Sequence, residues 1–429
     1  MTASIRTQVA IVGGGPAGMM HGLLMARAGI DVVVLEKHGD FLRDFRGDTV
    51  HPSTLEVIRE LGLLEDFLKR PHQELRELSG VIGGVNVKLA DFRHVRAHCR
   101  FIALMPQWDF LDFLASHAKR YANFRLLMEA EATGLIEEGG RISGVVADTQ
   151  DGRLELRADL VVGCDGRHSL IRDRAGLPLT EFGVPIDVLW MRLSKSPGDS
   201  PTTLGRIAAG RIFVTLDRGD YWQCALVISK DGAENLRAEG LEAFRQSILK
   251  VAPSFADRVG EIQSWDQVKL LTVKVNRLRE WCRPGLLCIG DAAHAMSPVG
   301  GIGINLAIQD AVAAANSLAP VFARGSVPSL DDLKRVQQRR EFPTKMTQAL
   351  QMAIQDRVMT RVLAAKSDPK PPYAVKLLNR FPFLRRIPAR IVGIGFRPEH
   401  VRSPIAAGPI AMSGPSGPMI PGPKLELEA

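Results

Sequence analysis

The apolar positions at the start of the chain predict a strand, a glycine-rich turn and a helix. VAIV at 9–12 is a continuous apolar run, GGGPAG follows at 13–18, and MMHGLLMARAG at 19–29 is apolar enough for a buried helix. DVVVLEK at 31–37 reads as a second buried strand with a charged end. This order predicts a βαβ unit.

Further along, the apolar pattern changes to alternating and short apolar runs between turn residues. These runs are typical of an antiparallel sheet; they are VIGGVNVKLADF at 81–92, RIFVTLD at 211–217, YWQCALVIS at 221–229 and VKLLTVKV at 268–275. Motifs of nucleotide-binding type return between them, at 159–166 and at 286–310. The sequence therefore predicts an antiparallel sheet inserted into a discontinuous nucleotide-binding domain.

We accordingly expect an α/β protein with a Rossmann-like domain, an inserted, mostly antiparallel substrate domain and a helical C-terminal region. The Rossmann-like domain is expected to comprise residues 1–72, 99–178 and 277–330, and the substrate domain residues 73–98 and 179–276. A helical pattern covers 331–402, and the Pro/Gly-rich stretch 403–429 has no periodic apolar face, which predicts a flexible tail.

Composition narrows the class of protein. With 429 residues, 45% hydrophobic and 24% charged, the chain is long enough for about two globular units. The five cysteines form no CxxC pair, which predicts reduced thiols and neither a disulfide framework nor a metal site. The N-terminal apolar run lacks a cleavage signal and no run reaches membrane length, so we expect a cytoplasmic protein.

The net charge of +8 comes from 55 basic against 47 acidic residues and reads as a diffuse basic surface. No basic block is interleaved with aromatic residues, so nucleic acid is not an expected partner.

The first glycine turn has the spacing of a dinucleotide site. Gly13, Gly15 and Gly18 form GxGxxG between a strand and a helix, where small residues let the backbone approach a pyrophosphate at the helix N-terminus. Glu36 ends the second strand 18 residues after Gly18, placed to accept hydrogen bonds from ribose hydroxyls. FAD and NAD present the same atoms to this unit, which does not distinguish them.

The later motif favours FAD. GLLCIGDAAH at 285–294 predicts a buried strand ending in Gly290 and Asp291, and the glycine-lined MSPVGGIGINLAIQDA at 296–311 opens a helix. An acidic strand end beside a glycine-lined helix start suits a polyhydroxyl chain and a flat ring. A helix beginning near Gly303 would direct its positive dipole end at the ring's pyrimidine edge, where a reduced flavin is anionic.

Three motifs together resemble those of the class A flavoprotein monooxygenases, typified by para-hydroxybenzoate hydroxylase. They are GGGPAG with Glu36, DLVVGCDGRHSLIR at 159–172 and GLLCIGDAAHAMSPVGGIGINLAIQDA. The three motifs span most of 1–310. The resemblance implies a non-covalent FAD site that comprises Gly13, Gly15, Pro16, Ala17, Gly18, Glu36, Lys37, Arg46, Gln107, Asp165, Gly290, Asp291, Gly301, Gly303, Ile304 and Asn305. It also implies that Pro298 lines the oxygen and substrate side of the flavin.

Within this resemblance, Arg46 matches a contact near the pyrophosphate, Gln107 and Asp291 match ribityl contacts, and the Asp165-Gly166 pair also serves the nicotinamide cofactor. No second Rossmann unit is present, as expected where NAD(P)H docks transiently. The implied reaction is hydroxylation of an aromatic or other electron-rich substrate by NAD(P)H and O2 through a flavin hydroperoxide, with the hard chemistry carried by the cofactor.

Two alternatives share this fold: a flavin-dependent reductase or halogenase, and a ligand-binding flavoprotein without turnover. The halogenase motif WxWxIP is absent from the chain.

The substrate side is less defined. Alternation in the expected strands places Arg211 and Phe213 on one face, and Trp222 alternates similarly, so these three are candidates for a pocket that binds a small aromatic or apolar substrate. No compact Ser/Arg/Tyr set for a small benzoate is evident. The basic and apolar segment 372–402 suits a pocket lid, a membrane-surface contact or a packed helix pair. Monomer and homodimer are both expected possibilities.

Overall fold

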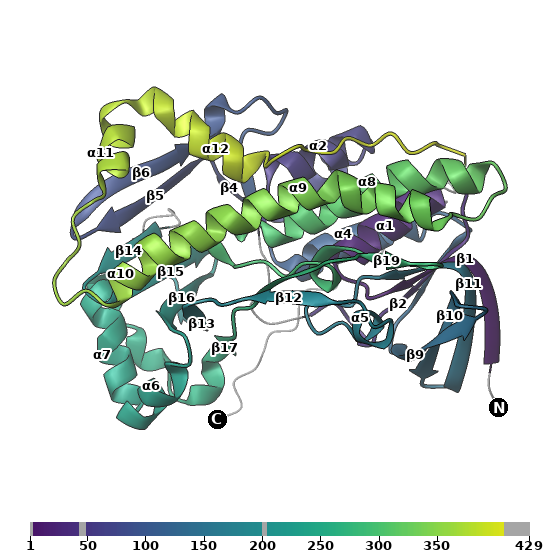
Figure 1. The fold of residues 1–429 in the computed structure, drawn as a ribbon. Coiled ribbons are helices and arrows are strands. Elements are labelled where there is room, and N and C mark those ends of the chain that lie inside the picture. The colour runs from purple at the N-terminus through teal and green to yellow at the C-terminus, as the bar shows by residue number, and fades with distance from the viewer. Residues whose placement is uncertain (1–2, 43–48, 200–203, 407–429) are drawn as a thin grey trace.

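The structure is a computed structural model that describes residues 3–42, 49–199 and 204–406. Two large sheets lie at opposite ends of the molecule, and the long helices α8 (Gly303–Ala323) and α9 (Leu330–Ile354) run side by side between them (Figure 1). Helices cover sheets in both halves, which confirms the α/β fold expected from the sequence.

The first sheet contains the predicted βαβ unit. Its central strands are parallel in the order β20-β11-β1-β2-β8, with β19 antiparallel at one edge and β9 and β10 extending from β11. The strands are β1 (Ala3–Val12), β2 (Val32–Leu35), β8 (Phe124–Leu127), β9 (Glu131–Glu138), β10 (Arg141–Thr149), β11 (Gly152–Gly163), β19 (Cys282–Arg283) and β20 (Leu286–Cys288). Val9–Val12 of β1 and Val32–Leu35 of β2 are almost completely buried, as expected for strands covered on both faces.

Helices α1 (Pro16–Arg27), α4 (Gln107–Ala118) and α8 pack against one another over this sheet. Helix α8 is long and apolar enough to span a membrane, but 78% of its most apolar window is buried, as in the core helix of a soluble protein. All five cysteines are buried, and none of them forms a disulfide.

The second sheet has seven strands in the order β17-β13-β16-β15-β14-β5-β6. Its strands are β5 (Glu77–Ile82), β6 (Val85–Asp91), β13 (Ile186–Ser194), β14 (Leu204–Ala208), β15 (Arg211–Asp217), β16 (Tyr221–Ser229) and β17 (Lys269–Leu271). All neighbours are antiparallel except β14 and β5, which pair in parallel. The hairpin of β5 and β6, from the expected segment 73–98, thus pairs with β14, which follows it in the sequence by more than a hundred residues.

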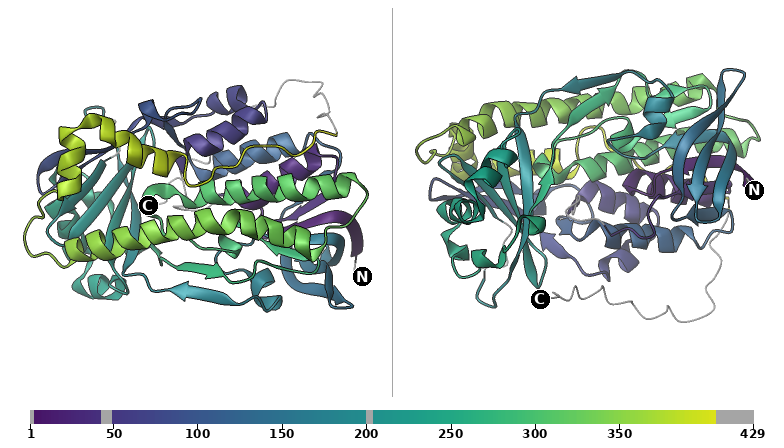
Figure 2. Two further views of the ribbon diagram at one scale, coloured as in Figure 1. Left: turned by 45° about the horizontal axis from the view of Figure 1, so that its top comes forward. Right: turned by 90° about the horizontal axis from the view of Figure 1, so that it is seen from below.

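The two faces of the second sheet are covered by different helices. One face packs against α6 (Ala233–Glu239) and α7 (Leu241–Val251). The other packs against Met359, Val362 and Leu363, from the π-helical turn Gln355–Met359 and α10 (Thr360–Leu363) that continue α9. Figure 2 shows this continuous helical path from the first sheet to the second.

The run at 268–275, predicted as one strand, is divided between two sheets. Lys269–Leu271 pairs with β13, whereas β18 (Val275–Leu278) pairs with β12 (Leu179–Phe182) in a separate ribbon. The Nζ of Lys230 and the amide of Val273 both bond to Asp187, which holds the chain where it leaves the sheet. The expectation of one strand was therefore wrong.

The remaining elements are β3 (Thr49–Val50), β4 (Gln73–Leu75), β7 (Ile102–Leu104), α2 (Pro52–Glu60), α3 (Leu64–Leu68) and α5 (Leu170–Arg174).

The C-terminal part of the chain returns across the molecule. Helices α11 (Tyr373–Arg380) and α12 (Arg386–Gly393) lie on β6, and the following segment runs back to α1. The start of the predicted flexible tail is held in place, because the amide of Ala406 donates to the Arg27 carbonyl at 3.2 Å and Ser403 is buried. Residues 407–429 lie outside the described residues.

Two buried histidines make the stability of this fold depend on pH. Burial lowers the pKa of His21 and of His51 to about 4, against a weaker opposing effect of their bonds to the carbonyls of Ala311 and Val392. Between about pH 4 and 6.5 the unfolded chain binds more protons than the folded one, so stability is lost as the pH falls through this window. Each shift corresponds to roughly 3 kcal/mol.

We therefore expect His51→Gln to unfold in urea with a weaker pH dependence between 6.5 and 4 than the parent chain. His98→Gln, at an exposed position, is the control and should leave the slope unchanged. Parallel pH profiles for the parent chain and His51→Gln would contradict a neutral, buried His51.

Candidate cofactor and active site

The predicted cofactor motifs converge at one edge of the first sheet. Val12, Gly163 and Cys288 are aligned at the carboxyl ends of β1, β11 and β20. The three glycine and aspartate motifs begin directly after these residues. The carboxyl edge of a parallel sheet is where such folds bind ligands, so segments some 270 residues apart build one site.

The glycines of the first turn have separate structural reasons. Gly13 has φ +105°, and a Cβ there would lie 2.4 Å from the Cys164 carbonyl oxygen. A Cβ on Gly18 would lie 2.0 Å from the Gly13 carbonyl oxygen. Gly15, at the N-terminus of α1, has nothing within 4 Å of a Cβ, which leaves open space in front of the helix. The first turn of α1 contains no acidic residue, so its N-terminus suits a pyrophosphate.

Glu36 is held at the end of β2. Its carboxylate accepts hydrogen bonds from the amides of Gly14, at 3.0 Å, and His38, at 3.2 Å. The turn and the acidic residue are therefore one rigid unit. This is the arrangement in which a carboxylate can receive ribose hydroxyls beside a bound pyrophosphate.

Asp165, at the same edge of the sheet, holds the turn between β11 and α5 in place. Its carboxylate accepts from the Ser169 hydroxyl at 2.5 Å and from the Ile171 amide at 3.0 Å, at the start of α5. Burial raises the pKa of Asp165, although these two bonds oppose the shift. The side chain thus shapes the turn after β11, leaving Gly166, with open space around it, as the point of close approach.

Gly290 lies where α1, which follows the first glycine motif, and α8, which follows the last one, both approach the chain. It has φ +61°, and a Cβ there would lie 3.1 Å from that of Ala17 in α1 and 3.3 Å from that of Ala307 in α8. Its amide donates to Asp310 at 3.1 Å. The next residue, Asp291, is half-buried, and its carboxylate forms no hydrogen bond or ion pair within the described part of the chain.

Asp310 is the centre of a buried charged network that the sequence did not reveal. It also contacts the Nε2 of His294 at 2.5 Å and the Nε of Arg340 at 2.8 Å, and Arg340 reaches Glu399 at 3.5 Å. Burial by itself raises the pKa of Asp310, but the charges and hydrogen bonds of His294 and Arg340 lower it on balance. The carboxylate therefore stays ionised and fixes the turn that presents Asp291.

The N-terminus of α8 lies beside this turn. Pro298 is half-buried and precedes Gly300 and Gly301, which have φ of 78° and 63°. A Cβ on Gly301 would lie 2.3 Å from the Thr49 hydroxyl, which donates to the Gly301 carbonyl. Helix α8 then starts at Gly303 and Ile304 with no side-chain cap and no acidic residue in its first turn, so its first amides remain available to an electron-rich ring edge.

Asn305 braces this helix start from within. Its Oδ1 accepts from the His51 amide and the Thr54 hydroxyl, both at 2.8 Å, and its Nδ2 donates to the carbonyls of Thr49 and Gly301. Both polar atoms of the Asn305 side chain thus form hydrogen bonds with protein groups, so only the backbone of Asn305 remains available to a cofactor.

The other predicted cofactor residues differ in their setting. Gln107 is half-buried at the first position of α4 with no hydrogen bond to any described residue, so its amide is available. Lys37 is exposed and lies 3.9 Å from Glu131. Arg46 lies outside the described residues.

The family comparison decides what this site holds. The FAD-binding-domain family matches residues 6–349, which is most of the chain. This chain belongs to the class A FAD-dependent monooxygenases. Among its relatives, the 6-methylpretetramide 4-monooxygenase of Streptomyces rimosus is 33% identical over 389 residues, covering 90% of this chain and 92% of the relative. The 3-demethoxyubiquinol 3-hydroxylase of Escherichia coli is 24% identical, covering 78% and 85%.

Solved structures agree on the fold of this monooxygenase. PqsL of Pseudomonas aeruginosa, described as a probable FAD-dependent monooxygenase, superposes with a TM-score of 0.71 at 23% identity, covering 84% of this chain and 98% of its own. The predicted family, fold class and FAD cofactor are thereby confirmed.

The three predicted substrate residues of the monooxygenase lie on the face of the second sheet that α7 covers. Arg211, Phe213 and Trp222 are directed at the helical layer of α7, where Arg211 bonds to Ser247 and Phe213 is fully buried against Phe255. The Nε1 of Trp222 donates to Asp199 at 2.9 Å. Phe213 and Trp222 are buried on this face, whereas Arg211 is half-buried at its edge, so their role as substrate residues stays a prediction.

The opposite face of β15 and β16, which we call the accessible face, is only partly covered, by Met359, Val362 and Leu363. Val214 and Leu216 alternate with the buried Phe213 and are themselves half-buried. Gln223 on β16 accepts from the Nε of Arg218 at 2.9 Å, and its own Nε2 is buried without a partner among the described residues. Period-two alternation predicted which residues share a face, but no local signal shows which face a distant helix covers.

Proposed function

We propose that this monooxygenase hydroxylates an electron-rich, largely apolar aromatic substrate held between the N-terminus of α8 and the accessible face of the second sheet. The observation that carries the proposal is the uncapped helix start at Gly303. The α9 path connects the turn before this helix, through Gln351, Gln355 and Met359, to the half-buried apolar face that contains Val214. The relative that acts on 6-methylpretetramide, at 33% identity, supports a substrate of similar kind.

Helix α9 and the turn that continues it connect these two regions. Gln351 donates to the carbonyls of Ser297 and Val299, and Gln355 donates to the Ser297 hydroxyl at 2.7 Å. Met359, one turn later, packs on the accessible face of the sheet. The α9 path therefore sets the distance between the Pro298 turn and the substrate face.

In this proposal the FAD ligands are the groups described above. Backbone amides at Gly15 and the start of α1 hold the pyrophosphate, Glu36 the adenosine ribose, and Gln107 and Asp291 the ribityl chain. Gly301, Gly303, Ile304 and Asn305 present backbone to the pyrimidine edge, and Pro298 lines the substrate side. FAD supplies the activation of O2; the chain orients the ring, excludes water and holds the substrate.

The electron donor is proposed to be NAD(P)H, which docks without a Rossmann unit of its own. We retain a cytoplasmic location and a monomeric or homodimeric state as predictions.

The direct test is NAD(P)H consumption by FAD-loaded protein across phenols, polycyclic phenols, 6-methylpretetramide and quinone precursors, with products analysed by mass. A compound that accelerates consumption and gains one oxygen atom supports the proposal. If no compound gains oxygen, a reductase or a ligand-binding flavoprotein becomes the better description of the site.

A bulky substitution on the accessible face should impair substrate use selectively. We expect Leu216→Trp to lower kcat/KM at least about tenfold, a loss of roughly 1.4 kcal/mol of transition-state stabilisation, with FAD affinity unchanged. Leu249→Trp is the matched control, because Leu249 is also half-buried but packs on the α7 face. Equal effects of the two substitutions on kcat/KM would argue against a pocket at Leu216.

A further inference from the structure

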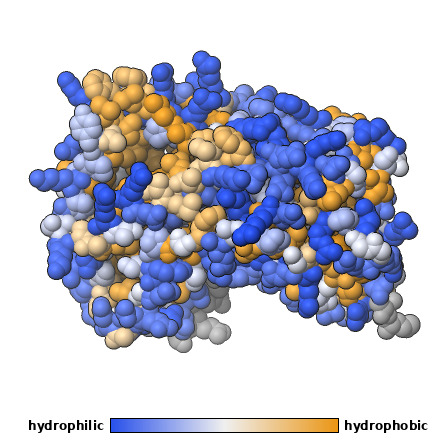
Figure 3. All heavy atoms as spheres, viewed as in Figure 1, coloured by the Kyte–Doolittle hydropathy of each residue, from blue (hydrophilic) through white to orange (hydrophobic). Residues whose placement is uncertain are grey.

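Helices α11 and α12 present an exposed apolar surface that the FAD site does not use. Tyr373 is 80% exposed, Phe383 59% and Ile387 53%, with Phe381 and Leu377 beside them. Figure 3 shows this surface as a cluster of hydrophobic side chains at the upper left, around a hollow. Large aromatic and aliphatic groups gathered on one surface of a protein mark an interaction site.

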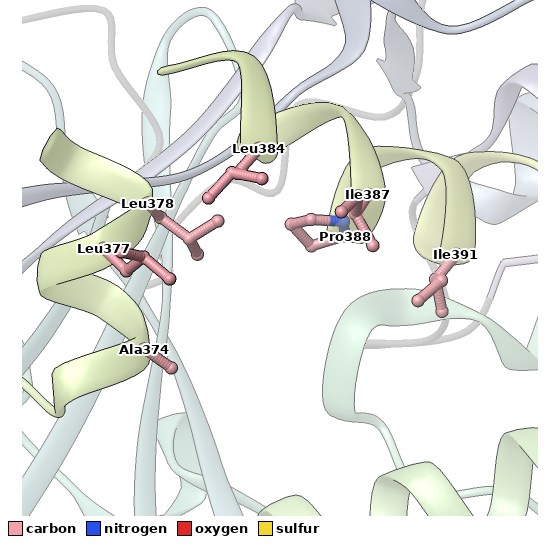
Figure 4. Close-up of a pocket in the computed structure, with 7 residues that line it drawn as sticks. All are labelled: Ala374, Leu377, Leu378, Leu384, Ile387, Pro388 and Ile391. Carbon is pink, nitrogen blue, oxygen red and sulfur yellow. The ribbon is translucent and has the colours of Figure 1, made fainter. Parts of the chain in front are cut away.

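The hollow lies inside the bend between the two helices. It has a volume of about 380 Å³ and is lined only by apolar residues, among them Leu378, Leu384 and Pro388. Figure 4 shows these side chains directed into the space between α11 and α12. Its size and lining suit a hydrocarbon chain, because it offers no polar side chain to a polar ligand.

The same segment is strongly basic. Between Asp368 and Glu399 the chain has seven basic and no acidic residues: Lys370, Lys376, Arg380, Arg385, Arg386, Arg390 and Arg397. The whole chain has a net charge of 55 − 47 = +8, so this short segment holds nearly all of the excess. Much of the basic excess of the chain therefore lies in this segment.

These cations are not neutralised within the described molecule. None of the seven forms an ion pair with a described residue, and all except the half-buried Arg385 are exposed. Arg385 bonds instead to the carbonyls of Leu378 and Asn379, which fixes the bend. The surface therefore combines apolar side chains at its centre with free positive charge around them.

We infer that the α11–α12 surface binds an anionic lipid bilayer, with the apolar side chains entering the acyl boundary and the cations contacting lipid phosphates. Amphipathic helices with Lys and Arg around exposed aromatic residues bind membranes in this way. The charge argues against a second copy of the chain, because a two-fold contact would bring two such basic segments together. Exposed aliphatic groups argue against a nucleic acid.

The surface also lies close to the proposed active site. The Val392 carbonyl at the end of α12 contacts the Nδ1 of His51 at 2.8 Å, and the His51 amide bonds to Asn305 at the start of α8. A bilayer bound here would therefore be linked, through α12 and His51, to the start of α8, beside which we propose that the apolar substrate binds. The inference does not depend on the identity of that substrate.

The test is flotation of the FAD-loaded full chain with vesicles of phosphatidylcholine alone and with phosphatidylglycerol added. We expect binding only to the phosphatidylglycerol vesicles, weakened by 0.5 M salt. The pair Lys376→Gln and Arg380→Gln should lower the partition coefficient about 25-fold, near fivefold for each cation. Phe383→Asp with Ile387→Asp should abolish flotation at low salt.

Arg153→Gln and Val327→Asp are the matched controls, since both positions are exposed and lie far from α11 and α12 in sequence. FAD absorbance and thermal unfolding check that every variant is folded. Protein that remains in the dense fraction with phosphatidylglycerol vesicles overturns the inference. So does equal flotation of control and surface variants, or a solution dimer that Ile387→Asp dissociates, which would assign the surface to a second copy.

Discussion

Replacing Asp291 by alanine should lower the affinity for FAD about 100-fold. The carboxylate is half-buried at the carboxyl end of β20, follows the close-packed Gly290, and has no partner among the described residues. A hydrogen bond to a charged acceptor contributes about 1.5–3 kcal/mol, and a 100-fold loss corresponds to about 2.7 kcal/mol, so the loss of one strong bond to a ribityl hydroxyl would account for it. Titration of the apoprotein with FAD, followed by flavin fluorescence, measures it.

Two further variants sharpen this prediction. Asp291→Asn keeps the shape and one acceptor and should lose less affinity than Asp291→Ala. Asp331→Ala, at an exposed position in the first turn of α9, controls for a change in net charge. Unchanged FAD affinity in Asp291→Ala would remove this residue from the ribityl site and leave Gln107 as the remaining predicted ribityl contact.

Replacing Arg340 by methionine should destabilise the folded protein by about 3–5 kcal/mol, because it leaves a buried carboxylate without its cation. Arg340 is fully buried, and its guanidinium pairs with Asp310 at 2.8 Å and Glu399 at 3.5 Å. Asp310 also receives the Gly290 amide, so we expect weaker FAD binding as well. Urea unfolding of the apoprotein and FAD titration measure the two effects separately.

Arg339→Met is the matched control for this network. Arg339 also pairs with Glu399, at 2.5 Å, but a third of its side chain is exposed and it does not contact Asp310. We expect a loss near 1 kcal/mol for this pair, in line with exposed ion pairs. An unfolding free energy for Arg340→Met within 1 kcal/mol of the parent chain would show that Asp310 does not need this cation.

The backbone conformations at the proposed cofactor site were predictable because their requirements are local. A glycine is needed where the backbone has positive φ or another backbone approaches, as at Gly13 and Gly290, and such positions have recognisable spacing in the sequence. The acidic strand end at Glu36 and the helix start at Gly303 are likewise set by neighbours in the chain. Family, fold class and FAD could therefore be inferred from motifs alone.

What only the tertiary structure decided concerns contacts between distant segments. Alternation placed Phe213 and Leu216 on opposite faces of β15, but the packing of α7 decided that Phe213 is core and Leu216 is accessible. The Asp310–Arg340–Glu399 network likewise joins residues far apart in the chain. Local periodicity determines which side chains share a face, whereas the partner of that face depends on how the whole chain packs.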